Sequence, residues 1–247
     1  MTPAEQFVSM LKDSNRIVFF GGAGVSTASG IPDFRSANGL YNQKYKRTLS
    51  PEEMVSHSFF VRDPEDFFDF YREKLIYPEA QPNDCHKALA ALEKAGKLTA
   101  VVTQNIDGLH QKAGSKNVFE LHGSVLRNYC TNCHKFFDET AILNAKGVPR
   151  CDRCGGVIKP DVVLYEEMLD EDVMDGAARA IMKADMLIIG GTSLIVYPAA
   201  GFVRYFRGNH LVLINKSTTS MDSEADLVFH EDIAAVLGDA VRTLGLM

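Results

Sequence analysis

The segment spanning residues 16–35, RIVFFGGAGVSTASGIPDFR, constrains the fold of this chain more than any other stretch. It places a short apolar run, residues 17–20, directly before a glycine-rich turn. Such a run is typical of a buried strand in a parallel sheet. Glycines after it let the backbone turn tightly and approach a ligand closely. The amide groups of the next helix would then face a diphosphate, so the segment predicts a nucleotide-binding turn.

This turn departs from the ordinary dinucleotide fingerprint. Gly22 and Gly24 match its first two glycines, but Thr27 stands where the third is expected. A lone Gly-x-Gly is also compatible with a purely structural turn. Dehydrogenases carry an acidic residue about 20 residues further on. Residues 42–46 read NQKYK there and show no strand pattern, so hydride transfer is disfavoured.

Apolar runs alternate with helical patterns along most of the chain. The runs are residues 17–20, 98–103, 118–120, 186–189, 211–214 and 227–229. The helical patterns are residues 2–13, with a capping box at Thr2, and residues 83–95, 170–183, 198–206 and 233–244. This order predicts an α/β fold: a Rossmann-like parallel sheet with helices on both faces. The length of 247 residues fits one domain with insertions.

Charge and hydropathy narrow the class of protein. With 26 basic and 32 acidic residues, the net charge of −6 disfavours non-specific nucleic-acid binding. No apolar run approaches the length of a membrane span, and the first residues, MTPAE, lack a signal-peptide pattern. We expect a cytoplasmic monomer with no direct nucleic-acid or membrane partner.

Four of the five cysteines form two Cys-x-x-Cys pairs. Cys130 and Cys133 are followed, after 17 residues, by Cys151 and Cys154. This spacing predicts a zinc ribbon, and four thiolates leave no open position on the metal, so one structural zinc is expected. A redox-active Cys-x-x-Cys is the alternative. We expect Cys85 to be a buried thiol and His134 a surface residue.

Polar side chains follow several of the predicted strands. Gln104, Asn105 and Asp107 come directly after the strand at residues 98–103. Ligands bind at the carboxyl ends of such strands, and these groups suit ribose hydroxyls and a carboxamide. Asp107 is also compatible with a simple helix cap. His122 comes just after the short strand at residues 118–120. It is either a structural residue or a general base.

The last two strands end in a similar way. Thr192 and Ser193 follow residues 186–189, and Asn215 follows residues 211–214. Either set alone is compatible with a loop. Together, at two strand ends of one sheet, they predict the second half of a dinucleotide site.

These motifs, taken in order, resemble the sirtuin family over nearly the full length of the chain. The matching sequences are GAGVS from Gly22, GIPDFR from Gly30, TQNIDGLH from Thr103, His122-Gly123, both cysteine pairs, GTSL from Gly191, and Asn215. The resemblance to bacterial members implies an NAD-dependent protein lysine deacetylase. Such an enzyme removes acetyl groups, with longer apolar acyl groups as an alternative, and gives nicotinamide, O-acetyl-ADP-ribose and free lysine.

The resemblance also implies the site residues. His122 and Asn105 would be catalytic: the acetyl oxygen attacks C1′ of the nicotinamide ribose, and His122 deprotonates a ribose hydroxyl. An acetyl-lysine peptide would lie as an extended strand between Val162, Val163, Leu164 and Tyr165 on one side and Ile195 and Val196 on the other. NAD would contact Ala23, Gly24, Thr27, Asp33, Phe34, Arg35, Gln104, Asn105, Ile106, Asp107, His122, Gly191, Thr192, Ser193, Asn215, Lys216, Asp232 and Ile233.

Two lobes are expected because two segments interrupt the alternation of strands and helices. A large NAD-binding lobe comprises residues 1–35, 83–126 and 160–247. A small lobe combines a helical insertion with the cofactor loop, residues 36–82, and the zinc ribbon, residues 127–159.

Two departures concern the acyl-peptide. Glu166 replaces a glycine usual in the family. Tyr71 and Lys74 stand where members that prefer succinyl or malonyl groups carry Tyr-x-x-Arg. A lysine replaces a bidentate guanidinium poorly, so we expect acetyl or apolar acyl groups to be preferred.

Two other functions are compatible with the same cleft. One is a mono-ADP-ribosyltransferase, which would release nicotinamide whether or not an acetyl-lysine peptide is present. The other is a non-catalytic sensor of NAD or ADP-ribose that uses the ribbon for partners. A sensor needs no general base, so His122 argues against it.

Overall fold

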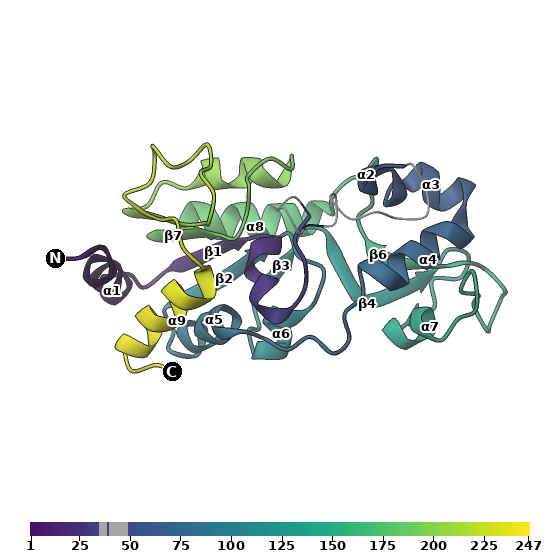
Figure 1. Cartoon of the computed structure of the whole chain (residues 1–247), viewed down its shortest axis with the longest axis horizontal. Helices are drawn as coiled ribbons and strands as arrows, with labels where there is room; N and C mark the ends of the chain where they lie inside the picture. The colour runs from purple at the N-terminus through teal and green to yellow at the C-terminus, as the bar shows by residue number, and fades with distance from the viewer. Residues whose placement is uncertain (35–38, 40–48) are drawn as a thin grey trace.

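The computed structural model describes residues 1–34, 39 and 49–247, and it divides into a larger and a smaller part along its longest axis (Figure 1). The larger part is built on a six-stranded sheet with strand order β3-β2-β1-β7-β8-β9, in which every neighbouring pair is parallel. Its strands are β1 (Ile17–Gly21), β2 (Leu98–Thr103), β3 (Val118–Glu120), β7 (Met186–Gly190), β8 (His210–Ile214) and β9 (Leu227–Phe229). The expected parallel sheet is confirmed.

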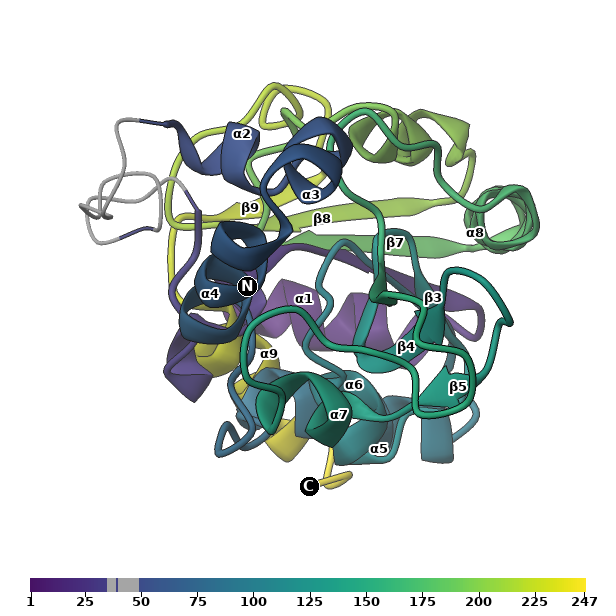
Figure 2. The same cartoon turned by 90° about the vertical axis from the view of Figure 1, so that its right-hand side faces the viewer.

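Helices cover both faces of this sheet (Figure 2). The helices α1 (Pro3–Asp13), α5 (Asp84–Lys94), α6 (Leu109–Ala113) and α9 (Ile233–Thr243) lie on one face, and α8 (Glu171–Lys183) and the 3-10 helix η4 (Ala199–Tyr205) on the other. Successive residues of a strand point to opposite faces of the sheet. Phe19 therefore packs in the core beneath α1, α5 and α9, the first core, and Val18 and Phe20 pack in the core beneath α8 and η4, the second core. Because both faces are buried, the strands are apolar throughout.

The carboxyl ends of four central strands lie in register. Gly21 of β1 pairs with Thr103 of β2 and with Gly190 of β7, which in turn pairs with Ile214 of β8. The residues that follow each strand therefore emerge along one edge of the sheet. Register alone brings together the polar segments that begin at residues 22, 104, 191 and 215.

The smaller part contains a three-stranded antiparallel sheet of order β5-β4-β6. Its strands are β4 (Gly123–Cys130), β5 (Phe136–Phe137) and β6 (Ile158–Val162). Short helices pack against it: α2 (Pro51–Met54), α3 (His57–Arg62), α4 (Pro64–Lys74) and α7 (Glu139–Leu143). Phenylalanines dominate this third core, where Phe60, Phe67 and Phe68 make edge-to-face contacts.

Local signals explain several helix boundaries. The capping box at Thr2 is confirmed, because its side chain accepts from the amide of Glu5 and the Glu5 side chain accepts from the amide of Thr2.

Both termini lie on the larger part (Figure 1). The lobe boundaries given above remain a prediction.

The segment after β1 differs from the expected helix. It forms two 3-10 turns, η1 (Ala23–Val25) and η2 (Thr27–Ser29), and ends at Gly30 with a φ of +84°. The Thr27 hydroxyl donates to the Gly24 carbonyl, and the Ser26 hydroxyl donates to Asp107. Small hydroxyl residues form such side-chain bonds in competition with the helical pattern, which explains the difference.

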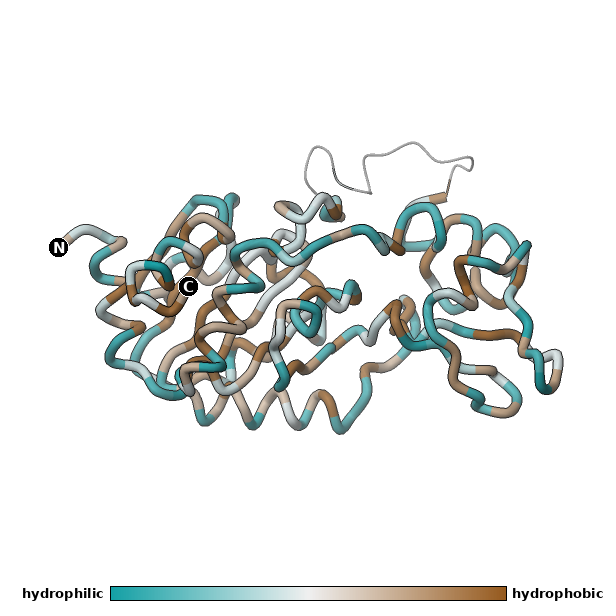
Figure 3. Tube along the Cα trace, turned by 90° about the horizontal axis from the view of Figure 1, so that it is seen from below, coloured by the Kyte–Doolittle hydropathy of each residue, from teal (hydrophilic) through white to brown (hydrophobic). Residues whose placement is uncertain are grey.

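Apolar and polar segments alternate along the trace in both parts of the molecule (Figure 3). Among the described residues, none of the helices combines the length and apolar character needed to cross a membrane.

Candidate functional site

A cleft of about 840 Å³ opens at the carboxyl ends of β1, β2, β7 and β8. Val55, Lys74 and residues 162–167 complete its wall. Seventeen of the residues predicted to contact NAD line this cleft: Ala23, Gly24, Thr27, Asp33, Phe34, Gln104, Asn105, Ile106, Asp107, His122, Gly191, Thr192, Ser193, Asn215, Lys216, Asp232 and Ile233. Arg35 lies outside the described residues.

Two glycine turns pack backbone against backbone at the floor of the cleft. The Gly24 amide donates to the Gly191 carbonyl over 2.8 Å. A Cβ atom on Gly24 would lie 2.8 Å from the Gly191 Cα, and one on Gly191 would lie 2.4 Å from the Val25 nitrogen. Gly191 also has a φ of +59°, which favours glycine. The two glycines therefore allow close packing of the turns, and both turns line the cleft, as glycines do at a dinucleotide site.

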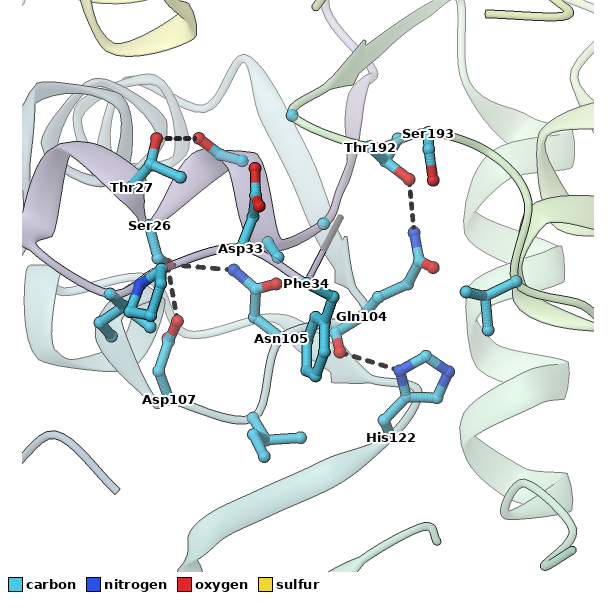
Figure 4. A pocket seen from close by; sticks show the side chains of 18 of the residues that line it. Ser26, Thr27, Asp33, Phe34, Gln104, Asn105, Asp107, His122, Thr192 and Ser193 are labelled. Carbon is cyan, nitrogen blue, oxygen red and sulfur yellow. Dashed lines mark hydrogen bonds between the residues drawn. The ribbon is translucent and has the colours of Figure 1, made fainter. Parts of the chain in front are cut away.

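Ser26 connects two of the predicted site residues (Figure 4). Its hydroxyl donates to Asp107 Oδ2 over 2.6 Å, and Asn105 Nδ2 donates to the same hydroxyl oxygen over 3.0 Å. Because the single hydroxyl proton goes to the carboxylate, Asn105 must present its NH₂ group to Ser26. Its carbonyl oxygen is then free to face the cleft, where it can accept a hydrogen bond from a ribose hydroxyl.

Asp107 serves the local fold as well as the site. Its Oδ1 accepts from the Leu109 amide over 2.9 Å in a turn that leads into α6. The N-cap of that helix is Gly108, which makes no side-chain cap hydrogen bond, so Asp107 is not itself the helix cap. Burial raises the pKa of Asp107, and the hydrogen bonds from Ser26 and Leu109 oppose that shift. Ser26 was not among the predicted contacts. Its position inside the glycine turn is the signal that would have found it.

His122 lies where β3 leads into β4, and its ring faces the cleft (Figure 4). Its Nδ1 is 2.9 Å from the carbonyl oxygen of Gln104. A carbonyl only accepts, so Nδ1 carries the proton and Nε2 keeps a free lone pair. Burial lowers the pKa of His122, and the hydrogen bond to Gln104 opposes the shift. The ring is therefore held in the neutral form and tautomer that a general base requires.

Gln104 links this histidine to the opposite wall. Its side-chain Nε2 donates to the Thr192 hydroxyl over 3.0 Å, and its backbone amide donates to the Gly21 carbonyl. One residue thus orients the imidazole and joins the ends of β1, β2 and β7.

The predicted peptide-binding residues lie on both sides of the cleft. Val162, Val163, Leu164, Tyr165 and Val196 line it. Ile195 is not among the lining residues, and it is 61% exposed. The Val163 amide donates to the His122 carbonyl over 3.0 Å, which joins this segment to the backbone of His122.

The two residues considered for acyl selectivity lie in different places. Lys74 lines the cleft, and its Nζ lies 3.1 Å from Glu73 Oε1. Tyr71 is fully buried, stacks on Phe67 and is not among the lining residues. Of this pair, only Lys74 lies at the cleft.

The four paired cysteines meet at one point. Their sulfur atoms all lie within 4.8 Å of one another, with Cys130 and Cys154 at 3.4 Å and Cys133 and Cys151 at 3.7 Å. Tetrahedral zinc with Zn–S bonds of about 2.3 Å requires sulfur atoms about 3.8 Å apart, so these thiols fit that ion. The Asn132 and Arg153 amides donate to Cys130 and Cys151. His134 is exposed, and Cys85 is buried in the first core, both as expected.

Comparisons with known proteins agree with this site. A model of the Sir2 family matches residues 22–198. The chain is 69% identical over 233 residues to a protein of Clostridium perfringens named NAD-dependent protein deacetylase, covering 94% of this chain and 96% of that one. A solved complex of Sir2 with a p53 peptide and NAD+ has 38% identity and a TM-score of 0.86, with both chains fully covered. A Sir2 complex with deacetylated p53 peptide and 3′-O-acetyl ADP ribose has 39% identity and a TM-score of 0.87, with 98% of each chain covered.

Proposed function

The chain belongs to the Sir2 family, and from that premise we propose that its cleft brings NAD and an acetylated lysine together at His122. The protein is an NAD-dependent protein deacetylase. It transfers the acetyl group of a protein lysine to ADP-ribose and gives nicotinamide, O-acetyl-ADP-ribose and free lysine. The observation that carries the assignment of the base is the protonated Nδ1 of His122 beside the Gln104 carbonyl, which leaves Nε2 unprotonated in the cleft.

Bound NAD supplies an activated ribose carbon from which nicotinamide can leave. Around it, we assign Asn105 and Gln104 to the nicotinamide ribose, and Ile106 and Asp107 to the nicotinamide pocket. The adenosine half is assigned to Thr192, Ser193, Asn215, Lys216, Asp232 and Ile233. Ala23, Gly24, Thr27 and Gly191 are assigned to the diphosphate, where backbone amides can donate to its oxygens.

His122 accepts the proton of a ribose hydroxyl at Nε2 during transfer of the acetyl group. Its Nδ1–H contact with Gln104 holds the ring in place while the charge develops. Phe34 and Asp33 line the same cleft. We assign Phe34 the exclusion of water from the reacting carbon, because a cation-like ribose would otherwise be captured by solvent.

The peptide is proposed to enter as an extended strand between residues 162–165 and Ile195 and Val196. Main-chain hydrogen bonds then supply most of its affinity, so sequence preference is weak. Lys74 is a point charge rather than a bidentate guanidinium, and acetyl or apolar acyl groups are therefore favoured over succinyl.

The compartment, the partners and the oligomeric state of the protein are also proposed. Four cysteines arranged as thiolate ligands fit a reducing compartment, in keeping with a cytoplasmic protein. The net charge of −6 fits a protein that has no direct nucleic-acid partner, and we propose that it works as a monomer.

The test is NAD turnover with and without peptide. The protein is incubated with NAD and a panel of acetyl-, butyryl- and succinyl-lysine peptides, and all products are identified by mass spectrometry. We expect nicotinamide release to depend on the acyl-peptide and to match formation of O-acetyl-ADP-ribose. Nicotinamide release that ignores the peptide would instead assign an ADP-ribosyltransferase activity.

A further inference from the structure

Glu166 holds an unusual backbone conformation at the edge of the cleft. Its φ is +77°, in the left-handed region that residues with a side chain rarely adopt. Such a conformation persists where the surrounding contacts over-determine it. The side chain of Glu166 makes those contacts: its Oε2 accepts from the Ser58 amide over 2.8 Å and from the Ser58 hydroxyl over 2.7 Å. Ser58 lies in the first turn of α3.

The neighbouring backbone joins the same two segments. The Tyr165 amide donates to the Val55 carbonyl, and the His57 amide donates to the Tyr165 carbonyl, both over 3.0 Å. These bonds form a parallel bridge between Ser56 and Tyr165. The Glu166 carboxylate extends this bridge by one residue and bonds to the helix that follows it.

Glu167 secures the other side of the turn. Its Oε1 lies 2.8 Å from His57 Nδ1, and its Oε2 accepts from the Leu164 amide over 2.9 Å and from Lys159 Nζ over 3.0 Å. Glu167 therefore closes the turn on itself and also contacts α3. Glu166 differs because, among the described residues, its carboxylate accepts hydrogen bonds from α3 alone, both from Ser58.

The residues held in this way form the proposed wall of the peptide groove. Val163, three residues before Glu166, donates its amide to the His122 carbonyl over 3.0 Å. The segment of residues 162–166 thus has one attachment at the proposed base and another at α3. A displacement of its α3 end would shift a bound peptide relative to His122.

We propose that Glu166 is a positioning residue, which fixes the peptide-binding segment against α3 and thereby sets the affinity for the acetyl-lysine peptide. This inference deepens the proposed function and rests on it. The carboxylate bonds to Ser58 on α3, and Glu166 is not among the residues assigned to NAD, so we expect it to act on peptide binding rather than on the chemical step.

Three variants separate positioning from stability. Glu166→Gly removes both the carboxylate and the strain of a side chain at positive φ, so its effects on folding oppose each other. Glu166→Ala removes the carboxylate and keeps the strain. Glu166→Gln keeps an acceptor for Ser58. The control Glu171→Gln removes an equal charge from the nearby start of α8, at an exposed residue.

Steady-state kinetics on the wild-type protein and these variants give the first readout. For both Glu166→Gly and Glu166→Ala we expect KM for an acetyl-lysine peptide to rise about two- to twelvefold, the range of one ordinary hydrogen bond, because Glu166 is exposed and solvent weakens its bonds to Ser58. KM for NAD should change less than about twofold. The kcat should change little, because the variants lose peptide-binding energy that is equal in the ground state and the transition state. Glu166→Gln should recover most of the peptide affinity, and Glu171→Gln should match the wild type.

Amide hydrogen exchange gives a second readout that needs no turnover. We expect the amides of Ser58 and Tyr165 to exchange faster in Glu166→Gly than in the wild type, with the central strands unchanged. An unchanged peptide KM in Glu166→Gly, or equal increases in KM for NAD and peptide, would overturn the proposal. Absence of peptide-dependent turnover in the wild type would refute the proposed function instead, and the exchange rates would still test the contact with α3.

Discussion

The Nδ1 atom of His122 lies 2.9 Å from the backbone carbonyl oxygen of Gln104, and this contact decides which ring nitrogen can act as a base. The same Gln104 donates its side-chain amide to the Thr192 hydroxyl. The residue that follows β2 therefore orients the imidazole with its backbone and contacts the turn after β7 with its side chain. Site geometry and sheet register are fixed together, because both depend on where β2 ends.

Replacing His122 with alanine tests the role of the base. We expect kcat for deacetylation to fall about 10²- to 10⁴-fold, the usual effect of losing a general base. Binding of NAD, measured by calorimetry, should stay within about threefold, because the glycine turns and polar strand ends remain. His210→Gln is the matched control, since His210 begins β8 at the end opposite the cleft. Turnover unchanged in His122→Ala would exclude this histidine from the mechanism.

The pH dependence follows from the burial of the same ring. Burial lowers the pKa of His122 below 6.5, and its hydrogen bond to Gln104 opposes that effect. Only the neutral ring can accept a proton, so activity should be lost as the pH falls through this lowered pKa. A profile of kcat/KM against pH should give an acid limb with a midpoint below 6.5. A midpoint above that value would contradict the assignment.

Acid unfolding must be separated from this effect. Burial also lowers the pKa of His86, to about 4, and that of His110. Both histidines are neutral when folded, so the stability that depends on their neutral state is lost as the pH falls below their unfolded values. Circular dichroism across the same pH range distinguishes loss of structure from protonation of His122.

The sequence predicted the strand ends well because periodicity and register are local or regular properties. Apolar runs fixed the strands, and the parallel order placed Gln104, Thr192 and Asn215 along one edge. The bond between Ser26 and Asp107 spans 81 residues, and that between Ser58 and Glu166 spans 108. Such side-chain contacts depend on how distant segments pack, which local patterns do not encode.

The prediction of a helix after β1 was wrong for a related reason. The pattern of small residues is compatible with a helix, but hydroxyl groups in the turn bond elsewhere. The metal site shows the opposite case. Two Cys-x-x-Cys knuckles each fix their own local geometry, so spacing alone predicted that all four sulfur atoms would meet.

Removing one thiolate tests the structural role of zinc. Cys130 is fully buried at the end of β4, so Cys130→Ser should abolish stoichiometric zinc, measured by atomic absorption, and should destabilise the smaller sheet. Zinc binding contributes about 10–16 kcal/mol to the folding of isolated zinc-finger peptides, so a large fall in melting temperature is expected. Cys85 lies in the first core, away from the four paired cysteines, so Cys85→Ala should keep one zinc per chain. Retention of zinc by Cys130→Ser would refute the four-thiolate site.

The close approach of Gly24 and Gly191 gives the last prediction. A Cβ atom on Gly24 would lie 2.8 Å from the Gly191 Cα and 2.9 Å from its carbonyl oxygen. Both are backbone atoms, so no side-chain rotation can relieve the clash, and the hydrogen bond from the Gly24 amide to Gly191 must lengthen. Gly24→Ala should therefore lower stability by about 1–3 kcal/mol, as overpacking does in cores.

The same substitution should weaken NAD binding more than stability alone implies. Separating the two turns displaces the amides assigned to the diphosphate, so we expect KM for NAD to rise at least about tenfold, while KM for the peptide changes less. Gly201→Ala is the matched control, because the nearest atom to its Cβ is Tyr197 Cε1 at 3.8 Å. Chemical denaturation and steady-state kinetics on both variants provide the measurements. A Gly24→Ala protein that is destabilised but binds NAD normally would show that the turns are packed for folding alone.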